Sequence, residues 1–156
     1  DKGNFDKFGH SVSISGKYAI VGAFQKLGRT GAAYIFERDA SGNWIEQQKL
    51  EASDKTTYAQ FGYSVSISED YIIVGANGKS DGSIRTNGAA YIFELGSNGN
   101  WTEVKKLLAS DKASYDEFGR SVSISDDYAI VGAYSEDDGI TLNNGAAYIF
   151  ERDANG

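Results

Sequence analysis

Few residues in this sequence could carry out catalysis or bind a transition metal. The chain has one histidine, His10, and no cysteine, so a zinc site built from several histidines or thiolates and a thiol nucleophile are both excluded. Serine is frequent, but it recurs at equivalent positions with no base beside it, which is not the pattern of a nucleophile. Since no acid–base pair and no nucleophile–base pair stands out, we expect a protein that is not an enzyme.

Carboxylates are the most abundant chemical groups, and they are unevenly placed. The net charge of −7 arises wholly in residues 111–156, which carry ten acidic and three basic residues. This acidity argues against binding to the phosphate backbone of nucleic acid. Four neighbouring residues could offer oxygen ligands to a hard cation such as Ca²⁺, without the spacing of a known calcium loop: Glu136, Asp137, Asp138 and Asn143. We expect no cofactor, with calcium as the alternative.

The sequence consists of three copies of one unit. Each copy has Phe-Gly near its start, at Phe8, Phe61 and Phe118, which are 53 and 57 residues apart. After Phe-Gly each copy has one variable residue and then Ser-Val-Ser-Ile-Ser, followed two residues later by Tyr-x-Ile-Val-Gly-Ala. A variable loop comes next, and it ends at Gly-Ala-Ala-Tyr-Ile-Phe-Glu. The copies cover residues 1–53, 54–110 and 111–156. Copies this similar indicate one structural unit that stacks on itself.

Each copy predicts four short β-strands and almost no helix. Ser-Val-Ser-Ile-Ser alternates with period two, and the following apolar run is expected of a strand buried on both faces. The two-residue link between them, Gly16-Lys17 in the first copy, predicts a tight hairpin. The fourth strand begins at Trp44 or Trp101 and is rich in charge, which suits an exposed edge. The third copy ends before the place of this Trp, so we expect it to lack its outer strand.

Four-stranded antiparallel units repeated every 50–60 residues or so are typical of β-propeller blades. We therefore predict an all-β fold in which residues 1–156 form a single β-propeller segment of three blades. Three blades cannot close a ring. We expect either a piece of a longer propeller or a ring completed by further blades of the same or another chain, and the unclosed ends would expose apolar blade faces.

The three copies resemble the FG-GAP repeat family, whose name is spelled by the Phe-Gly and the Val-Gly-Ala of each copy. The resemblance extends over all 156 residues. It implies a propeller of roughly seven blades, as in the heads of integrin α-chains. It also implies an extracellular or cell-surface protein that binds a protein or a glycan. Where the family usually has Pro after Val-Gly-Ala, this chain has Phe24, Asn77 and Tyr134.

One departure from the family concerns calcium. In the integrin-like members an Asp-rich calcium loop joins the first and second strands, whereas this connection has two residues here. Ca²⁺ needs roughly six to eight oxygen ligands, which Asp126-Asp127 cannot supply alone. The sequence is similar to the short-turn variety of prokaryotic repeat proteins, and we do not expect the calcium site of the integrin-like members.

Two groups of residues are candidates for ligand binding. The variable residue after Phe-Gly is His10, Tyr63 or Arg120, near the predicted channel mouth. The variable loops are Phe24–Thr30, Asn77–Asn87 and Tyr134–Asn144, and their candidates are Asn77, Lys79, Asp81, Arg85 and Tyr134. Divergent loops on a near-identical scaffold are typical of recognition, and neutral drift of exposed loops is the competing explanation.

Other recurring residues are expected to serve the fold. Trp44 and Trp101 should pack over the sheet and anchor the outer strand. Asp54 and Asp111 open the connections between blades, and we expect them to accept hydrogen bonds from local backbone amides.

The sequence thus favours a non-enzymatic binding or adhesion module of a surface or secreted protein. It would recognise a protein or a glycan through its variable loops, without nucleic acid and without insertion into a membrane. Two alternatives remain open. One is a structural repeat that assembles between chains into a closed ring or a filament. The other is the propeller part of a larger glycan- or lipid-processing enzyme.

Overall fold

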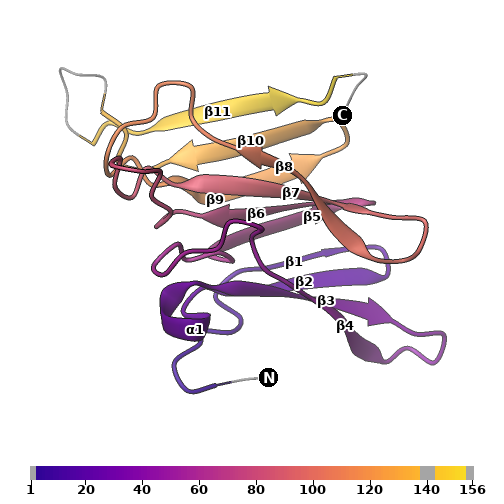
Figure 1. Ribbon diagram of the computed structural model, residues 1–156. Helices are drawn as coiled ribbons and strands as arrows, with labels where there is room; N and C mark the ends of the chain where they lie inside the picture. Colours follow the sequence, from indigo (N-terminus) through magenta and orange to yellow (C-terminus); the bar gives the residue numbers. More distant parts are fainter. Residues whose placement is uncertain (1–2, 138–142, 154–156) are drawn as a thin grey trace.

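The computed structural model describes residues 3–137 and 143–153. Three antiparallel β-sheets stand side by side in chain order, one for each sequence copy (Figure 1). The first sheet contains β1 (Val12–Ser15), β2 (Tyr18–Ala23), β3 (Ala32–Arg38) and β4 (Trp44–Leu50). The second contains β5 (Ser64–Ser68), β6 (Tyr71–Ala76), β7 (Ala89–Leu95) and β8 (Trp101–Leu107). The third contains β9 (Phe118–Ser125), β10 (Tyr128–Ala133) and β11 (Ala146–Glu151).

Each sheet is a meander in which every strand pairs with the next one along the chain. This is the topology of a propeller blade, so the prediction of an all-β propeller segment is confirmed. In the described part of the chain, helix is limited to α1 (Lys26–Arg29), a short irregular segment in the first variable loop. The third blade has three strands within these residues, and the three blades do not close a ring.

The two ends of the blades differ in their connections. Two-residue turns join the first and second strands of each blade at one end, as the sequence predicts. The described parts of the variable loops and the connections between blades lie together at the other end, on the left of Figure 1, which we call the loop face. Backbone hydrogen bonds hold these segments together. The amide of Phe61 donates to Thr30 O and that of Phe118 to Asn87 O, each at 3.1 Å.

Serine side chains connect the innermost strands of neighbouring blades. The backbone N–H groups of Val65, Ile67 and Glu69 on the second blade donate to serine Oγ atoms on the first, at 3.0, 3.2 and 3.1 Å. Their acceptors are Ser11, Ser13 and Ser15, respectively. The repeated serines therefore have a structural role: they face the next blade and satisfy the backbone of its first strand.

Aromatic side chains fill the space between strands and between blades. In each blade the Phe of Phe-Gly packs edge-on or tilted against the Tyr and the Phe of the third strand, as Phe61 does against Tyr91 and Phe93. Trp101 reaches back to the preceding blade and packs edge-on against Tyr18, with ring centroids 5.4 Å apart. It is 3% exposed, so it anchors one blade to another rather than only its own outer strand.

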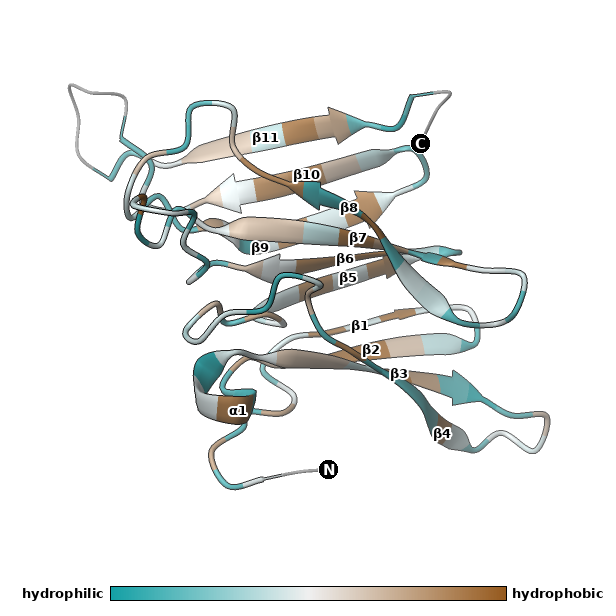
Figure 2. Ribbon diagram, viewed as in Figure 1, coloured by the Kyte–Doolittle hydropathy of each residue, from teal (hydrophilic) through white to brown (hydrophobic). Residues whose placement is uncertain are grey.

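The apolar residues of the first strand face the preceding blade. Val65 and Ile67 are 6% and 5% exposed because the first blade covers them. Their counterparts Val12 and Ile14 are 66% and 64% exposed, as expected for an open blade face. Figure 2 shows the apolar residues concentrated along the strands of the blades, with polar residues at the turns and on the outer strands.

Glycine permits the close approach of neighbouring blades at the end of each second strand. A Cβ atom on Gly75 would lie 2.0 Å from Gly119 O on the third blade and 2.2 Å from Ser64 Oγ. One on Gly22 would lie 2.1 Å from Gly62 O on the second blade. Backbone carbonyl groups cannot move aside as a flexible side chain can, so the Gly of Val-Gly-Ala is required wherever another blade follows.

We expect Gly75→Ala to lower the free energy of unfolding by about 2–3 kcal/mol, since the added methyl group must push two blades apart. Gly132→Ala is the matched control. Its Cβ would meet the Ser121 Oγ atom at 2.4 Å and no following blade, and a serine side chain can rotate. The loss there should be below about 1 kcal/mol. Urea unfolding of both variants measures the difference, and equal losses would contradict the proposed role of the blade contact.

Candidate functional site

The variable residues after Phe-Gly meet on the loop face. The rings of His10, Phe24 and Tyr63 form a three-membered cluster that bridges the first two blades. Ring centroids are 4.6 Å apart between His10 and Phe24, 4.8 Å between His10 and Tyr63, and 5.0 Å between Phe24 and Tyr63. Phe24 was not among the sequence candidates. Its position directly after Val-Gly-Ala, at the start of the first variable loop, could have identified Phe24 as a candidate.

Arg120 extends this cluster onto the third blade. Its guanidinium carbon lies 5.7 Å from the ring centroid of Tyr63 and 4.4 Å from that of Tyr134, and it forms an ion pair with Glu117. The five side chains His10, Phe24, Tyr63, Arg120 and Tyr134 therefore form one continuous row, which we call the central row. His10 and Tyr134 are its exposed members. Such a row offers ring faces, a cation and polar ring atoms to a ligand.

The other loop candidates divide into buried and exposed residues. Asn77 and Lys79 are each 4% exposed. The Lys79 ammonium donates to Asp54 O and lies 3.1 Å from the Asp54 carboxylate, so it fixes the base of its loop. Asp81 pairs with Lys112 of the next connection, and Arg85 is exposed. The structure thus places Asp81 and Arg85, but not Asn77 and Lys79, where a ligand could reach them.

The cation candidates are only partly described. The Asp137 carboxylate accepts a hydrogen bond of 2.5 Å from the backbone amide of Asn143, and the carbonyl of Glu136 accepts one from Gly145. Asp138 lies outside the described residues. Among the described residues, no group of three or more histidine, cysteine, aspartate or glutamate side chains could hold a metal ion.

Asp54 has a different role from the one predicted. Instead of binding local amides, its carboxylate accepts hydrogen bonds from the Tyr91 hydroxyl at 2.7 Å and the Lys106 ammonium at 2.8 Å. Asp111 repeats the contact with the Tyr148 hydroxyl at 2.7 Å. Burial opposes ionisation of Asp54, but hydrogen bonds from Lys106, Tyr91 and Lys79 outweigh it and lower its pKa to about 2. This aspartate therefore fastens the connection between blades to the third strand of its own blade.

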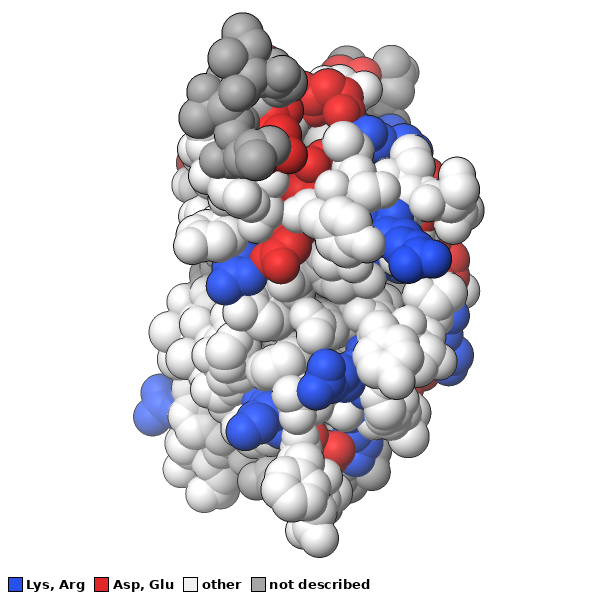
Figure 3. Space-filling model, turned by 90° about the vertical axis from the view of Figure 1, so that its left-hand side faces the viewer, with Lys and Arg blue, Asp and Glu red and all other residues white. Residues whose placement is uncertain are grey.

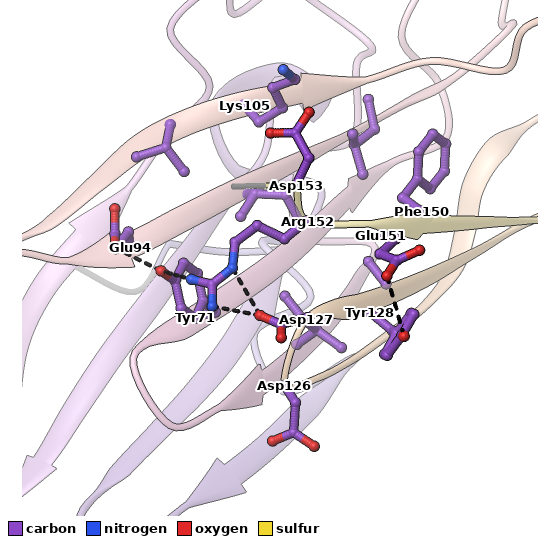
Figure 4. Close-up of a pocket in the computed structure, with 15 residues that line it drawn as sticks. Tyr71, Glu94, Lys105, Asp126, Asp127, Tyr128, Phe150, Glu151, Arg152 and Asp153 are labelled. Atoms are coloured by element: carbon purple, nitrogen blue, oxygen red, sulfur yellow. Dashed lines mark hydrogen bonds and ion pairs between the residues drawn. The ribbon is translucent and has the colours of Figure 1, made fainter. Parts of the chain in front are cut away.

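A pocket of about 800 Å³ lies between the second and third blades (Figure 4). No residue of the central row lines it. Four of its polar side chains interact with one another. The Arg152 guanidinium binds Asp127 and lies over the ring of Tyr71, whose hydroxyl donates to Glu94 at 2.7 Å. Tyr71 is the counterpart of Tyr18, which Trp101 of the outer strand covers in the preceding pair of blades. The pocket thus occupies the place that a fourth strand takes elsewhere in the fold.

Charge is divided across the loop face. Figure 3 views this face directly, and acidic side chains gather on its upper part, over the third blade, whereas basic side chains are spread more widely. No single sign covers the whole face. A ligand that spans the three blades therefore meets both signs of charge along its length.

A family model for the FG-GAP repeat matches residues 1–36, 44–93 and 101–150. The chain belongs to the FG-GAP repeat family. FG-GAP propeller repeats are generally non-catalytic modules, and they typically occur in extracellular or surface proteins. The second and third matches run from the outer strand of one blade into the third strand of the next, so these two FG-GAP units each include a contact between blades.

The comparison with curated proteins found no match for this FG-GAP chain. Among the residues that the structure describes, no helix has the length and hydrophobicity needed to cross a membrane.

Replacing Asp54 should reveal its contribution to the fold. We expect Asp54→Asn to lower the free energy of unfolding by about 1–2 kcal/mol at pH 7, because three donors lose their charged acceptor. Asp111→Asn is the matched control, since Tyr148 is the partner described for Asp111, and its loss should be smaller.

The loss from Asp54→Asn should also depend on pH. The folded pKa of about 2 lies below the ordinary aspartate value of 3.8, so the stabilisation is complete above about pH 5 and disappears as pH falls toward 2. Denaturant unfolding of wild type and variant between pH 2 and pH 7 measures this, and a gap that stays constant would contradict it.

Proposed function

We propose that this chain is a non-enzymatic binding module of a surface or secreted protein, and that its loop face recognises a protein or a glycan. The observation that carries the proposal is the central row, in which residues that differ between otherwise near-identical copies meet across all three blades. The blades supply rigid positions and the variable residues supply chemistry. Separate weak contacts on neighbouring blades add to give useful affinity.

Polar groups around the central row support recognition rather than catalysis. Arg120 is paired with Glu117 and stacked between Tyr63 and Tyr134, which holds its guanidinium in one orientation. The His10 ring packs against Phe24 and Tyr63, and in the described part of the chain no acidic or nucleophilic side chain forms a hydrogen bond with it. The row therefore has the features of a contact surface, with aromatic and arginine residues of the kind enriched in binding hot spots.

Binding assays on a panel of immobilised matrix proteins and polysaccharides test this function. We expect His10→Ala with Arg120→Ala to weaken binding about tenfold or more, since one end of the row and the guanidinium that links Tyr63 to Tyr134 are removed. Lys17→Ala is the control, because Lys17 pairs with Glu37 near the hairpin turn, away from the loop face. Circular dichroism confirms that each variant is folded. Unchanged binding by the double variant would exclude the central row as the site.

Assembly through open blade faces is a second candidate function, and the exposed strands favour it. Val12 and Ile14 on the first blade and Ile130 and Ile149 on the third are 43–73% exposed. Each face has a complementary one within the chain, since the first blade already binds the second through the same residue types. A further blade, from this or another chain, would make a head-to-tail contact of the same kind.

Light scattering over a range of concentrations tests the assembly of this chain. We expect a mass of at least twice 16.8 kDa at high concentration and its loss in a Val12→Lys, Ile14→Lys variant, because two charges would be buried in the contact. Lys17→Ala again serves as the control. A mass of 16.8 kDa at every concentration would exclude self-assembly of this chain.

A further inference from the structure

Three aromatic residues occupy the same exposed position on the loop face, one for each blade. Phe5, Tyr58 and Tyr115 each stand three residues before a Phe-Gly. They are 83%, 62% and 57% exposed, respectively. None of the three rings contacts another aromatic ring within the residues that the structure describes. We call them the aromatic triplet. They contribute little to the core, so packing does not explain why an aromatic residue stands there in every copy.

The backbone makes this choice of residue more unusual. Phe5, Tyr58 and Tyr115 have φ values of +66°, +65° and +76°, in the left-handed region that glycine adopts most easily and that bulky side chains disfavour. An aromatic residue held in a disfavoured conformation and exposed to solvent stabilises neither the backbone nor the core. Residues with this combination are concentrated at binding sites, where the side chain is needed for contact.

The turn that carries each ring is held by one equivalent hydrogen bond in the three blades. The carbonyl of the following residue accepts a hydrogen bond of 3.2 Å from the variable loop of the same blade. The donor–acceptor pairs are Gln25 with Asp6, Gly78 with Ala59 and Ser135 with Asp116. The three rings are therefore presented by equivalent, hydrogen-bonded turns at one position per blade. Rigid presentation lowers the entropy that a ligand must remove on binding.

The residues around each ring do not share its constancy. The position before the ring is held by Asn4, Thr57 and Ser114, and the position after it by Asp6, Ala59 and Asp116. Charge and size change among the latter three residues while the ring is kept. An aromatic residue thus recurs at this position in all three copies, although the residue that follows it differs in charge and size.

We propose that the aromatic triplet is a stacking platform for a neutral polysaccharide. The proposal rests on the binding function of the loop face and names its ligand class. Aromatic faces carry partial negative charge and attract the positive C–H groups on the flat face of a pyranose ring. One ring per blade matches a ligand made of repeating units, whereas hot spots for protein partners cluster at the packed centre of an interface. The net charge of −7 disfavours nucleic acid, the other polymer that stacks on aromatic rings.

Affinity electrophoresis in gels containing hydroxyethylcellulose, glucomannan or a soluble β-1,3-glucan tests the platform, together with sedimentation on insoluble chitin. We expect wild type to be retarded by at least one of these polymers, with little dependence on salt because no ion pair is involved. Removing one ring should weaken binding about three- to tenfold, and removing all three should abolish it.

Glycine is the most informative replacement for the three rings. A Phe5→Gly, Tyr58→Gly, Tyr115→Gly variant relieves the left-handed backbone, so its melting temperature should equal or exceed that of wild type while polysaccharide binding is lost. Phe5→Tyr and Tyr58→Phe keep a ring and should keep binding. Because the substitutions move stability and binding in different directions, a general loss of structure cannot imitate the expected result.

Two outcomes would overturn the platform: no retardation of wild type by any of these polymers, or unchanged binding by the triple-glycine variant. If wild type instead binds a matrix protein, and only the His10→Ala, Arg120→Ala variant loses that binding, the proposed function stands and the platform fails. If the triple-glycine variant loses binding to a matrix protein while no polysaccharide is bound, the triplet serves a protein partner and the polysaccharide proposal is wrong.

Discussion

The structure depends on how closely the first two strands of neighbouring blades can approach. Blades of a propeller converge toward one axis, and there the backbone of one strand meets that of the next with little room for side chains. Gly22 and Gly75 leave space for carbonyl groups of the following blade, and the serines of the first strand are small enough to fit while still accepting its amide hydrogens. A larger apolar residue would leave these amides without acceptors, and a larger polar one would not fit.

This packing constraint explains which residues are nearly identical in the three copies and which differ between them. Strand residues have neighbours on two blades, so Tyr91 and Phe61 are fully or almost fully buried in a packed environment that tolerates little change in volume. The loop face lies beyond the region of closest contact, and its residues must only maintain the hydrogen bonds between loop and connection. Divergence on the loop face and near-identity in the strands are thus two results of the same packing.

Much of the fold could be predicted because its signals are local. The period of two in Ser-Val-Ser-Ile-Ser and the short link at Gly16-Lys17 depend on neighbouring residues, and both predictions hold in the structure. Contacts between residues far apart in the sequence could not be predicted from local patterns, because they form only after the sheets assemble. Asp54 meets Tyr91 and Lys106, which lie 37 and 52 residues further along the chain, and Lys79 becomes buried against the same segment. The sequence predicts His10, Tyr63 and Arg120 as ligand-binding candidates near the channel mouth. Their contacts with Phe24 and Tyr134 depend on the stacking of blades and could not be predicted.

The serine contacts also bear on how the chain acquires its structure during synthesis. Each one joins residues about one blade apart, 54 positions for Ser11 and Val65, and none in the described set bypasses a blade. A blade leaving the ribosome therefore finds its docking surface already formed by the blade translated before it. Lengthening of the array by gene duplication would use the same contacts, because an added repeat packs against its neighbour through the interface that the existing repeats already form.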